Sequence, residues 1–170
     1  MKFDYTKRDE DFSNLLWITG LKKDKTEHRN HIKRIMVKDG KVVSTDGAEM
    51  REITLINTIP DGYYALLKRT KSEVSIFNEV SLEDESFPEY AEIMAVNGNV
   101  KLSLNVNSYG IDKGLCAVIR AMTEHSFNPI KYLEIFNGMD FQDVWVDPEG
   151  CRPAYFEATN VRAVLMPIRG

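Results

Sequence analysis

The chain has 170 residues, of which 43% are hydrophobic and 28% charged, and its formal net charge is -4. This length and composition predict one globular domain rather than a disordered chain. The negative charge argues against a strongly basic nucleic-acid binder, although a local basic patch could still contact DNA. Residues 1–20 do not resemble a signal peptide and no apolar run reaches membrane length, which favours a soluble cytoplasmic protein. Cys116 and Cys151 lack zinc or redox spacing, so two free buried thiols are expected.

The first half of the chain predicts one helix followed by a meander of three strands. Asp39-Gly40 is a two-residue hairpin signal, and Gly20 is expected to stop the helix. The helix should bury Phe12, Leu15, Leu16 and Trp17. The expected elements are a short strand at Lys2–Tyr5, a helix from about Lys7 to Thr19, and strands at Ile32–Val37, Lys41–Thr45 and Glu49–Ile56.

The middle of the chain predicts a further hairpin and then an acidic connection. Tyr63–Lys68 and Val74–Val80 have the composition of two strands around a polar bend. Ser81–Glu92 is rich in carboxylates and contains two aromatic rings, which indicates an exposed connection and the best candidate for an internal boundary.

The second half repeats the order strand, helix, strands. Alternation from Val100 to Val106 predicts a half-buried strand, and Ser108 can cap a helix. The inward stripe of that helix would be Ile111, Leu115, Val118, Ile119 and Met122. Further strands are expected at Tyr132–Phe136, Phe141–Val146, Ala154–Ala158 and Val161–Met166.

The doubled order predicts an α+β fold in which two helices pack on one face of a twisted antiparallel sheet. A unit this small cannot close a core alone, so the halves should join their sheets within one domain over 1–170. The first half would cover about 1–60, an inserted hairpin with the acidic connection about 61–95, and the second half about 96–170.

The last residues of the chain combine a strand pattern with a tail that could line an apolar pocket. Val161, Ala163 and Leu165 alternate with other residues, and Pro167 removes a backbone donor. Met166-Pro167-Ile168-Arg169 then offers a soft thioether, a kink, a branched apolar group and a cation. The alternative is an ordinary last strand that ties down the terminus.

Three short stretches resemble motifs of one known family. Ser44–Met50 is similar to Ala-Thr-Asp-Gly-His-Arg-Leu, Phe87–Tyr90 to Phe-Pro-Asp-Tyr, and Val164–Arg169 to Val-Val-Met-Pro-Met-Arg. Their order and the doubled outline resemble one domain of the bacterial sliding clamp, the β subunit of DNA polymerase III. In that family the domains form a ring around duplex DNA, and these motifs line an apolar pocket for short peptides of polymerases and other partners.

The resemblance therefore implies a sliding-clamp-like accessory protein of DNA replication, similar to a processivity factor, with an apolar peptide-binding groove. Such a protein could assemble with copies of itself around the duplex. The groove residues that the motifs imply are Thr45, Gly47, Met50, Pro88, Tyr90, Val164, Met166, Pro167, Ile168 and Arg169.

The chain departs from the family pattern in three ways. Ala48-Glu49 replaces the family's His-Arg, which removes a cation and adds an anion beside the groove. The family chain has three domains, whereas this one has room for one domain and the insertion. The family's Phe-Pro-Asp-Tyr and Met-Pro motifs also lie on different domains, so a pocket here would form within one domain or between neighbouring copies.

Binding to DNA would depend on cations that contact phosphates without reading sequence. The DNA-facing candidates are Lys22, Lys23, Lys25, Arg29, Lys113 and Arg120. A solvated basic loop is the alternative, because the same helices carry carboxylates. The alternative function is a clamp-fold module that binds a peptide and does not encircle DNA; a ring of one-domain subunits would need about six copies.

Few sequence features support a catalytic activity, and no cofactor or metal is expected. His28 and His31 near Glu27 give only a loose metal pattern in a lysine-rich stretch. The carboxylates Asp140, Asp143, Asp147 and Glu149 mostly occupy expected turns or a solvent face. No nucleophile has a partnered base, and no glycine loop could cradle a phosphate.

Overall fold

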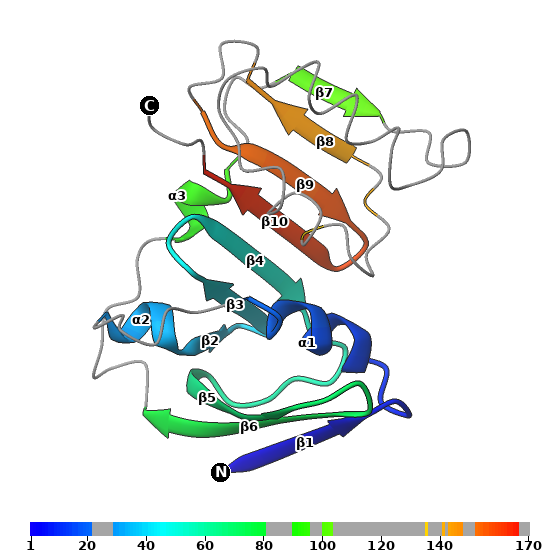
Figure 1. The fold of residues 1–170 in the computed structure, drawn as a ribbon, viewed down its shortest axis with the longest axis vertical. Coiled ribbons are helices and arrows are strands. Elements are labelled where there is room, and N and C mark those ends of the chain that lie inside the picture. Colours follow the sequence, from blue (N-terminus) through cyan, green and yellow to red (C-terminus); the bar gives the residue numbers. More distant parts are fainter. Residues whose placement is uncertain are drawn as a thin grey trace. The chain divides into compact units, whose positions relative to one another are not determined.

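The computed structural model describes residues 1–21, 29–80, 90–95, 100–103, 135, 141, 143–147 and 152–166. The chain divides into two compact units, Met1–Tyr90 and Ala91–Gly170 (Figure 1). That both belong to one domain stays a prediction. Within the described part of the chain, no helix is long and apolar enough to cross a membrane.

The first unit is built on an antiparallel sheet with the strand order β1-β6-β5-β2-β3-β4. The predicted antiparallel sheet is therefore confirmed in this unit. The hairpin predicted as an insertion lies inside the sheet, because β6 pairs with β1 and β5 pairs with β2. The strands are β1 (Lys2–Thr6), β2 (Ile35–Lys38), β3 (Lys41–Thr45), β4 (Glu49–Thr54), β5 (Gly62–Arg69) and β6 (Glu73–Val80).

The β2–β3 hairpin has the turn that the sequence predicts, but its first strand begins later. Asp39 and Gly40 have φ angles of 51° and 75°, the positive pair of a type I′ turn. Ile32, expected in a strand, belongs instead to the short helix α2 (Asn30–Lys33), which packs on β2 and β3. The Arg29 carbonyl accepts hydrogen bonds from the amides of Ile32 and Lys33, which closes this helical turn.

Helix α1 (Phe12–Ile18) packs on β4 and β6 and lies across one face of the first unit's sheet (Figure 1). Its buried residues are Phe12, Leu15, Trp17 and Ile18, whereas Leu16 is half-buried. The predicted start near Lys7 is wrong. The Asp9 carboxylate accepts hydrogen bonds from the amide and hydroxyl of Thr6, at 2.6 and 2.9 Å, and these hold a turn before the helix.

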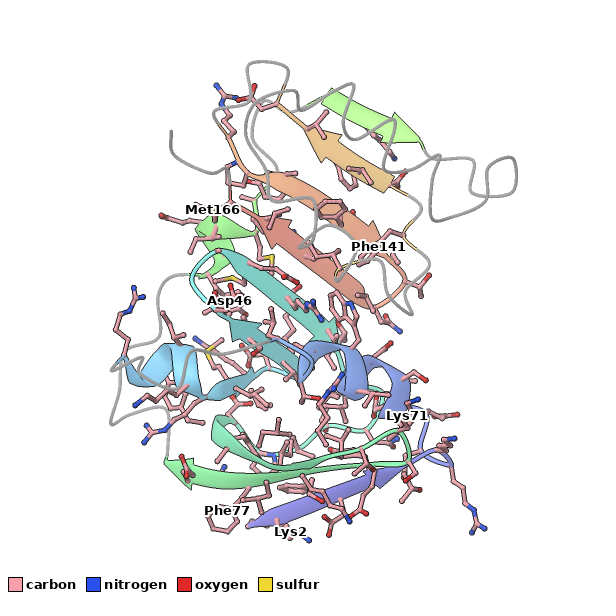
Figure 2. All side chains as sticks on the ribbon, in the orientation of Figure 1. Lys2, Asp46, Lys71, Phe77, Phe141 and Met166 are labelled. Carbon is pink, nitrogen blue, oxygen red and sulfur yellow. The ribbon has the colours of Figure 1, made fainter. Side chains whose placement is uncertain are left out.

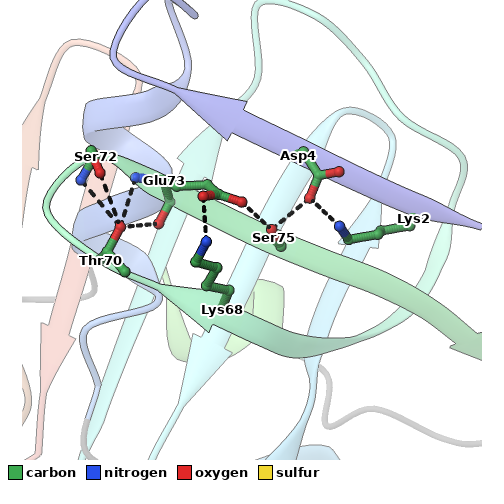
Figure 3. Close-up of polar contacts among 7 residues, drawn as sticks. All are labelled: Lys2, Asp4, Lys68, Thr70, Ser72, Glu73 and Ser75. Atoms are coloured by element: carbon green, nitrogen blue, oxygen red, sulfur yellow. Dashed lines mark hydrogen bonds and ion pairs between the residues drawn. The ribbon is translucent and has the colours of Figure 1, made fainter.

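Strand β1 pairs only with β6 among the described strands of the first unit, and its edge carries charged side chains. Lys2 lies 2.8 Å from Asp4, and the Ser75 hydroxyl donates to the same carboxylate at 2.5 Å (Figure 3). These two neighbours, Lys2 first, lower the pKa of Asp4. Lys68 lies 2.6 Å from Glu73 and lowers the pKa of that carboxyl. Lys2 and Asp4 on β1 are charges of the kind that discourage unwanted pairing at a sheet edge, whereas Lys68 and Glu73 belong to the inner strands β5 and β6.

The second unit contains a four-stranded antiparallel sheet among its described residues, in the order β10-β9-β8-β7. Its strands are β7 (Val100–Ser103), β8 (Asp143–Val146), β9 (Ala154–Ala158) and β10 (Val161–Leu165), and α3 (Tyr90–Ile93) precedes them. These strands confirm the predictions at the same places. Ile135 is buried and helical, so the strand expected over Tyr132–Phe136 is wrong at that residue. The helix expected from Ser108 lies outside the described residues.

One face of this second sheet forms the apolar core. Phe141 packs edge-on against Phe156, with ring centroids 5.9 Å apart, next to Val144. The opposite face carries Trp145, Tyr155 and Arg162 and is largely polar at its exposed positions. Because side chains alternate along a strand, Val164 lies on the face of Arg162, opposite Tyr155 in the register.

Candidate functional site

The turn between β3 and β4 is held by the side chains of its own residues Thr45 and Asp46. The Thr45 hydroxyl donates to the Glu49 carbonyl at 2.8 Å and accepts from the Gly47 amide at 3.0 Å. The Asp46 carboxylate accepts from the amides of Ala48 and Glu49, at 3.0 and 2.8 Å. Gly47 has φ 90°, a conformation that side chains other than hydrogen rarely allow. The motif therefore builds a rigid turn whose amide donors are already bound.

Helix α2 and Arg29, the residue before it, lie beside this turn and bring two side chains near Gly47. A Cβ atom on Gly47 would lie 3.6 Å from Cδ1 of Ile32 and 3.7 Å from a terminal nitrogen of Arg29. Ile32 is buried, and Arg29 is exposed. Sequence reasoning missed Ile32 at this place and assigned Arg29 to the DNA-facing set. The structure puts both next to a predicted groove residue.

Met50 is the third predicted groove residue on the β3–β4 hairpin, after Thr45 and Gly47. Its Cα pairs with that of Thr45 in the β3–β4 ladder, and both residues are buried. The structure therefore brings together Thr45, Gly47 and Met50 on one hairpin, with Asp46 at its turn (Figure 2). Because Met50 and Ile32 are both buried, the exposed side chain beside the glycine turn is that of Arg29.

Glu49, which the sequence places beside the groove as an added anion, points into the protein. Its exposed fraction is 1%, and it forms an ion pair with Nε of Arg51, whose exposed fraction is 2%. Arg51 also donates to the Trp17 carbonyl at 2.6 Å, and its guanidinium lies 4.6 Å from the centroid of the Trp17 ring. The carboxylate of Glu49 is therefore used to hold Arg51 and is not presented to a ligand.

The two described groove residues of the second unit, Val164 and Met166, lie at the end of β10. Val164 is buried, and Met166 is 40% exposed just beyond the strand (Figure 2). Arg162 donates to the Met94 carbonyl at 2.5 Å and so holds the segment after α3, the helix that begins at Tyr90, against β10. Beside this contact is a pocket of about 10 Å³, the size of one water molecule. Its lining includes Trp145 and Tyr155, which no motif had indicated.

Several predicted residues lie outside the described part of the chain. In the groove these are Pro88, Pro167, Ile168 and Arg169, and in the DNA-facing set they are Lys22, Lys23, Lys25, Lys113 and Arg120. The described groove residues belong to two units, and that they share one groove stays a prediction. The DNA-facing role of Arg29 also stays a prediction.

Two of the four carboxylates considered in the sequence, Asp143 and Asp147, have structural partners, and Asp140 and Glu149 lie outside the described residues. Asp143 pairs with Lys101 at 2.9 Å, and Asp147 accepts a hydrogen bond from the Arg152 amide at 2.9 Å. Among the residues that the structure describes, no group of three or more His, Cys, Asp or Glu side chains could hold a metal ion.

Comparison with known proteins finds similarity in structure. A scan of protein-family models gave no match, and neither did a search of curated proteins. The DNA polymerase sliding clamp of Pseudomonas aeruginosa matches 100% of this chain and 67% of its own, with a TM-score of 0.59 and 14% identity. The Bacillus subtilis sliding clamp matches 100% and 64%, with a TM-score of 0.63 and 10% identity.

The β subunit of DNA polymerase III from Thermotoga maritima matches 100% of this chain and 66% of its own, with a TM-score of 0.59 and 12% identity. The chain thus spans about two thirds of the length of these clamps. The resemblance carried by the three motifs is confirmed, and the chain has a clamp-like fold.

Proposed function

We propose that this chain is a sliding-clamp-like accessory protein of DNA replication. It would bind a linear peptide of a polymerase or another replication protein in an apolar groove and hold duplex DNA through cations that contact phosphates. The clamp-like fold over the whole chain supports this proposal. The observation that carries it is the rigid turn at Gly47 beside Ile32 and Arg29.

The chemistry of this turn indicates which part of a peptide it would receive. The turn amides of Gly47, Ala48 and Glu49 already donate to the side-chain oxygens of Thr45 and Asp46, so they are not the groups that would donate to a peptide. The buried Ile32 lies beside the turn, and the exposed Arg29 supplies a guanidinium that can hold a carboxylate or carbonyl of a peptide through two hydrogen bonds. Arg29 would thus provide the cation that the Ala48-Glu49 replacement removes from the family motif. Val164 and Met166, with the remaining predicted groove residues, would complete the site.

Titration of a short apolar clamp-binding peptide, followed by calorimetry, tests the groove. We expect Arg29→Ala to weaken binding by about tenfold through the loss of one charge-assisted contact. Ile32→Ala should weaken binding indirectly, because the buried side chain belongs to the packing of α2 on the sheet beside the turn. Lys33→Ala is the matched control, because it removes an exposed cation from α2, the helix that follows Arg29. Equal affinities for the native protein, Arg29→Ala and Ile32→Ala would refute the groove.

The second candidate function is a clamp-fold peptide-binding module that does not encircle DNA, and the net charge of -4 favours it. Light scattering after size exclusion separates the two, since a ring needs several copies whereas a module can be a monomer. DNA binding by the clamp should be weak, independent of sequence and steeply reduced by salt. A monomer that binds the peptide but does not bind duplex DNA at low salt would refute the clamp function and support the peptide-binding module.

A further inference from the structure

We propose that β1 is an interaction surface for a second copy of this chain, which adds its own β1 in antiparallel orientation across a two-fold axis. This contact is independent of the peptide groove and of any contact with DNA. On one side β1 pairs with β6, and no described element of the first unit lies along its other edge (Figure 1). An open strand edge of this kind can accept a further strand through its backbone groups.

One hydrogen bond shows which backbone groups of β1 point away from β6. The Asn78 amide donates to the Met1 carbonyl at 2.8 Å, one step before the pair Lys2 and Phe77 in the register. Bonded and non-bonded positions alternate along an antiparallel pair of strands. Met1 is a bonded position, so Lys2 and Asp4 direct their amides and carbonyls to the outer edge.

The outward groups of Thr6, the next residue in this alternation, are bound within the chain. The Asp9 carboxylate accepts from the Thr6 amide at 2.6 Å, and the Thr6 carbonyl accepts from the Asp9 amide at 2.9 Å. The open edge is therefore made of the amides and carbonyls of Lys2 and Asp4. A second strand would bind these groups and end at the turn that Asp9 closes.

The charges on this edge admit one register between two copies of β1. Lys2 and Asp4 are exposed on the same face, 2.8 Å apart, and Ser75 donates to the same carboxylate at 2.5 Å (Figure 3). When two copies pair about Phe3, each Lys2 lies opposite the partner's Asp4, and opposite charges stabilise facing strands. A shift by two residues either way keeps the backbone in phase but places two lysines or two aspartates opposite each other. Charges that discourage other strands thus fit a second β1.

The inner face of β1 supplies the apolar part of the contact. In this register Phe3 lies opposite the partner's Phe3 at a non-bonded position, where facing side chains are closest. Phe3 is half-buried beside Tyr64, with ring centroids 6.0 Å apart. Met1, which is 72% exposed, would lie opposite the partner's Tyr5. The contact is short, so we expect a weak dimer that forms with rising concentration. A two-fold contact closes on itself, so a ring of several copies would need a second, different contact.

Charge reversal tests this register. Sedimentation velocity from about 1 µM to 1 mM compares the association of the native chain with that of Lys2→Asp and Asp4→Lys. Each substitution places like charges opposite each other at both ends of the pairing, so each should weaken the native dimer at least about tenfold. An equimolar mixture of the two variants should associate, because every facing pair is then opposite in sign. The chain with both substitutions should dimerise as the native chain does.

Glu73→Lys is the matched control for the reversed charge. It acts on the neighbouring strand β6, where Glu73 pairs with Lys68 at 2.6 Å, and leaves the edge of β1 unchanged. Its dimer affinity should stay within about twofold of the native value. Residue-resolved hydrogen exchange reads the backbone contact. The amides of Lys2 and Asp4 should become protected as concentration rises, whereas the Phe3 amide, which points to β6, should not change.

Four results would overturn the inference. They are a native chain that stays monomeric, a variant mixture that associates no better than either variant alone, a Glu73→Lys loss equal to that of Asp4→Lys, and a dimer in which the Lys2 and Asp4 amides stay unprotected. Peptide titration of Asp4→Lys keeps this inference apart from the proposed function. Native peptide affinity in that variant is expected, so failure of the dimer would leave the groove untouched.

Discussion

Replacing Glu49 by glutamine should test whether the groove turn is tied to α1 by a buried charge. The carboxylate and the Arg51 guanidinium are 1% and 2% exposed, so neither can turn to water when its partner is lost. Glutamine keeps the shape of the side chain and removes only the charge. Arg51 would then remain buried with its hydrogen bond to Trp17 but without its counter-ion.

The magnitude follows from the cost of leaving a charge buried and unpaired. Breaking one side of a buried ion pair destabilises a protein by about 3–5 kcal/mol. Glu52→Gln is the matched control on the same strand. Glu52 is also buried, but its partner Lys41, at 3.6 Å, has a side chain that is 40% exposed and can be solvated. That substitution should cost at most about 1 kcal/mol.

Urea denaturation measures the difference in unfolding free energy between Glu49→Gln and Glu52→Gln, with far-UV circular dichroism as one probe. Fluorescence in a Trp145→Phe background is the second probe, because Trp17 is then the only tryptophan and lies under Arg51. The Glu49→Gln midpoint should fall well below that of Glu52→Gln. Equal midpoints would show that the Glu49–Arg51 pair stabilises the protein no more than the Glu52–Lys41 pair does, which would refute the expected cost of an unpaired buried charge.

Three further outcomes are expected. Asp11→Ala should lower the free energy of unfolding by about 3 kcal/mol in urea denaturation, because its carboxylate accepts from the Ile56 and Asn57 amides at 2.8 and 3.0 Å; a loss below about 1 kcal/mol would contradict this. Burial and then the charge of Asp11 raise the pKa of Tyr5 to about 12, above its unfolded value near 10, so stability should fall as pH rises from 10 to 12. Tyr5→Phe should reduce that decline in denaturation curves, and an unchanged decline would remove Tyr5 as its cause. Deleting Met166–Gly170 should abolish peptide binding in titration while circular dichroism keeps the native strand signal, and unchanged affinity would show that the tail is only a strand end.

Much of the first unit could be predicted from local sequence, because its turns have strong chemical signals. Asp39-Gly40 predicts a two-residue hairpin, and the observed φ angles confirm it. The start of α1 could not be read in the same way, since the turn before it depends on how Asp9 binds Thr6. Nor could α2, because Ile32 stands close before the apolar run Ile35–Val37, and a single strand ending at the Asp39-Gly40 turn also explains that stretch.

The candidate site was predictable only where a motif marked it. Thr45 and Gly47 stand in a motif, and the structure explains them as the parts of a rigid turn. Ile32 and Arg29 reach that turn through the packing of α2 on the sheet, which no local pattern encodes. The inward direction of the Glu49 side chain could have been predicted from the sequence. Every second residue of a strand lies on the same face, so Glu49 and Arg51 share the face of Ile53, which belongs to the core.

Because position 49 lies on the buried face of β4, replacing Glu49 by the arginine of the family motif should affect the stability of the protein. In the clamp motif that Ser44–Met50 resembles, this position is arginine. Glu49→Arg would place a second guanidinium beside the buried Arg51 instead of a cation at the groove. We expect a loss of at least about 3–5 kcal/mol in urea denaturation, the cost of an unpaired buried charge before any repulsion is added. Ala48→His, which restores the neighbouring family residue at an exposed position, should stay within about 0.5 kcal/mol. A Glu49→Arg protein of native stability would mean that this side chain can turn outward, and that the groove can regain its cation there without Arg29.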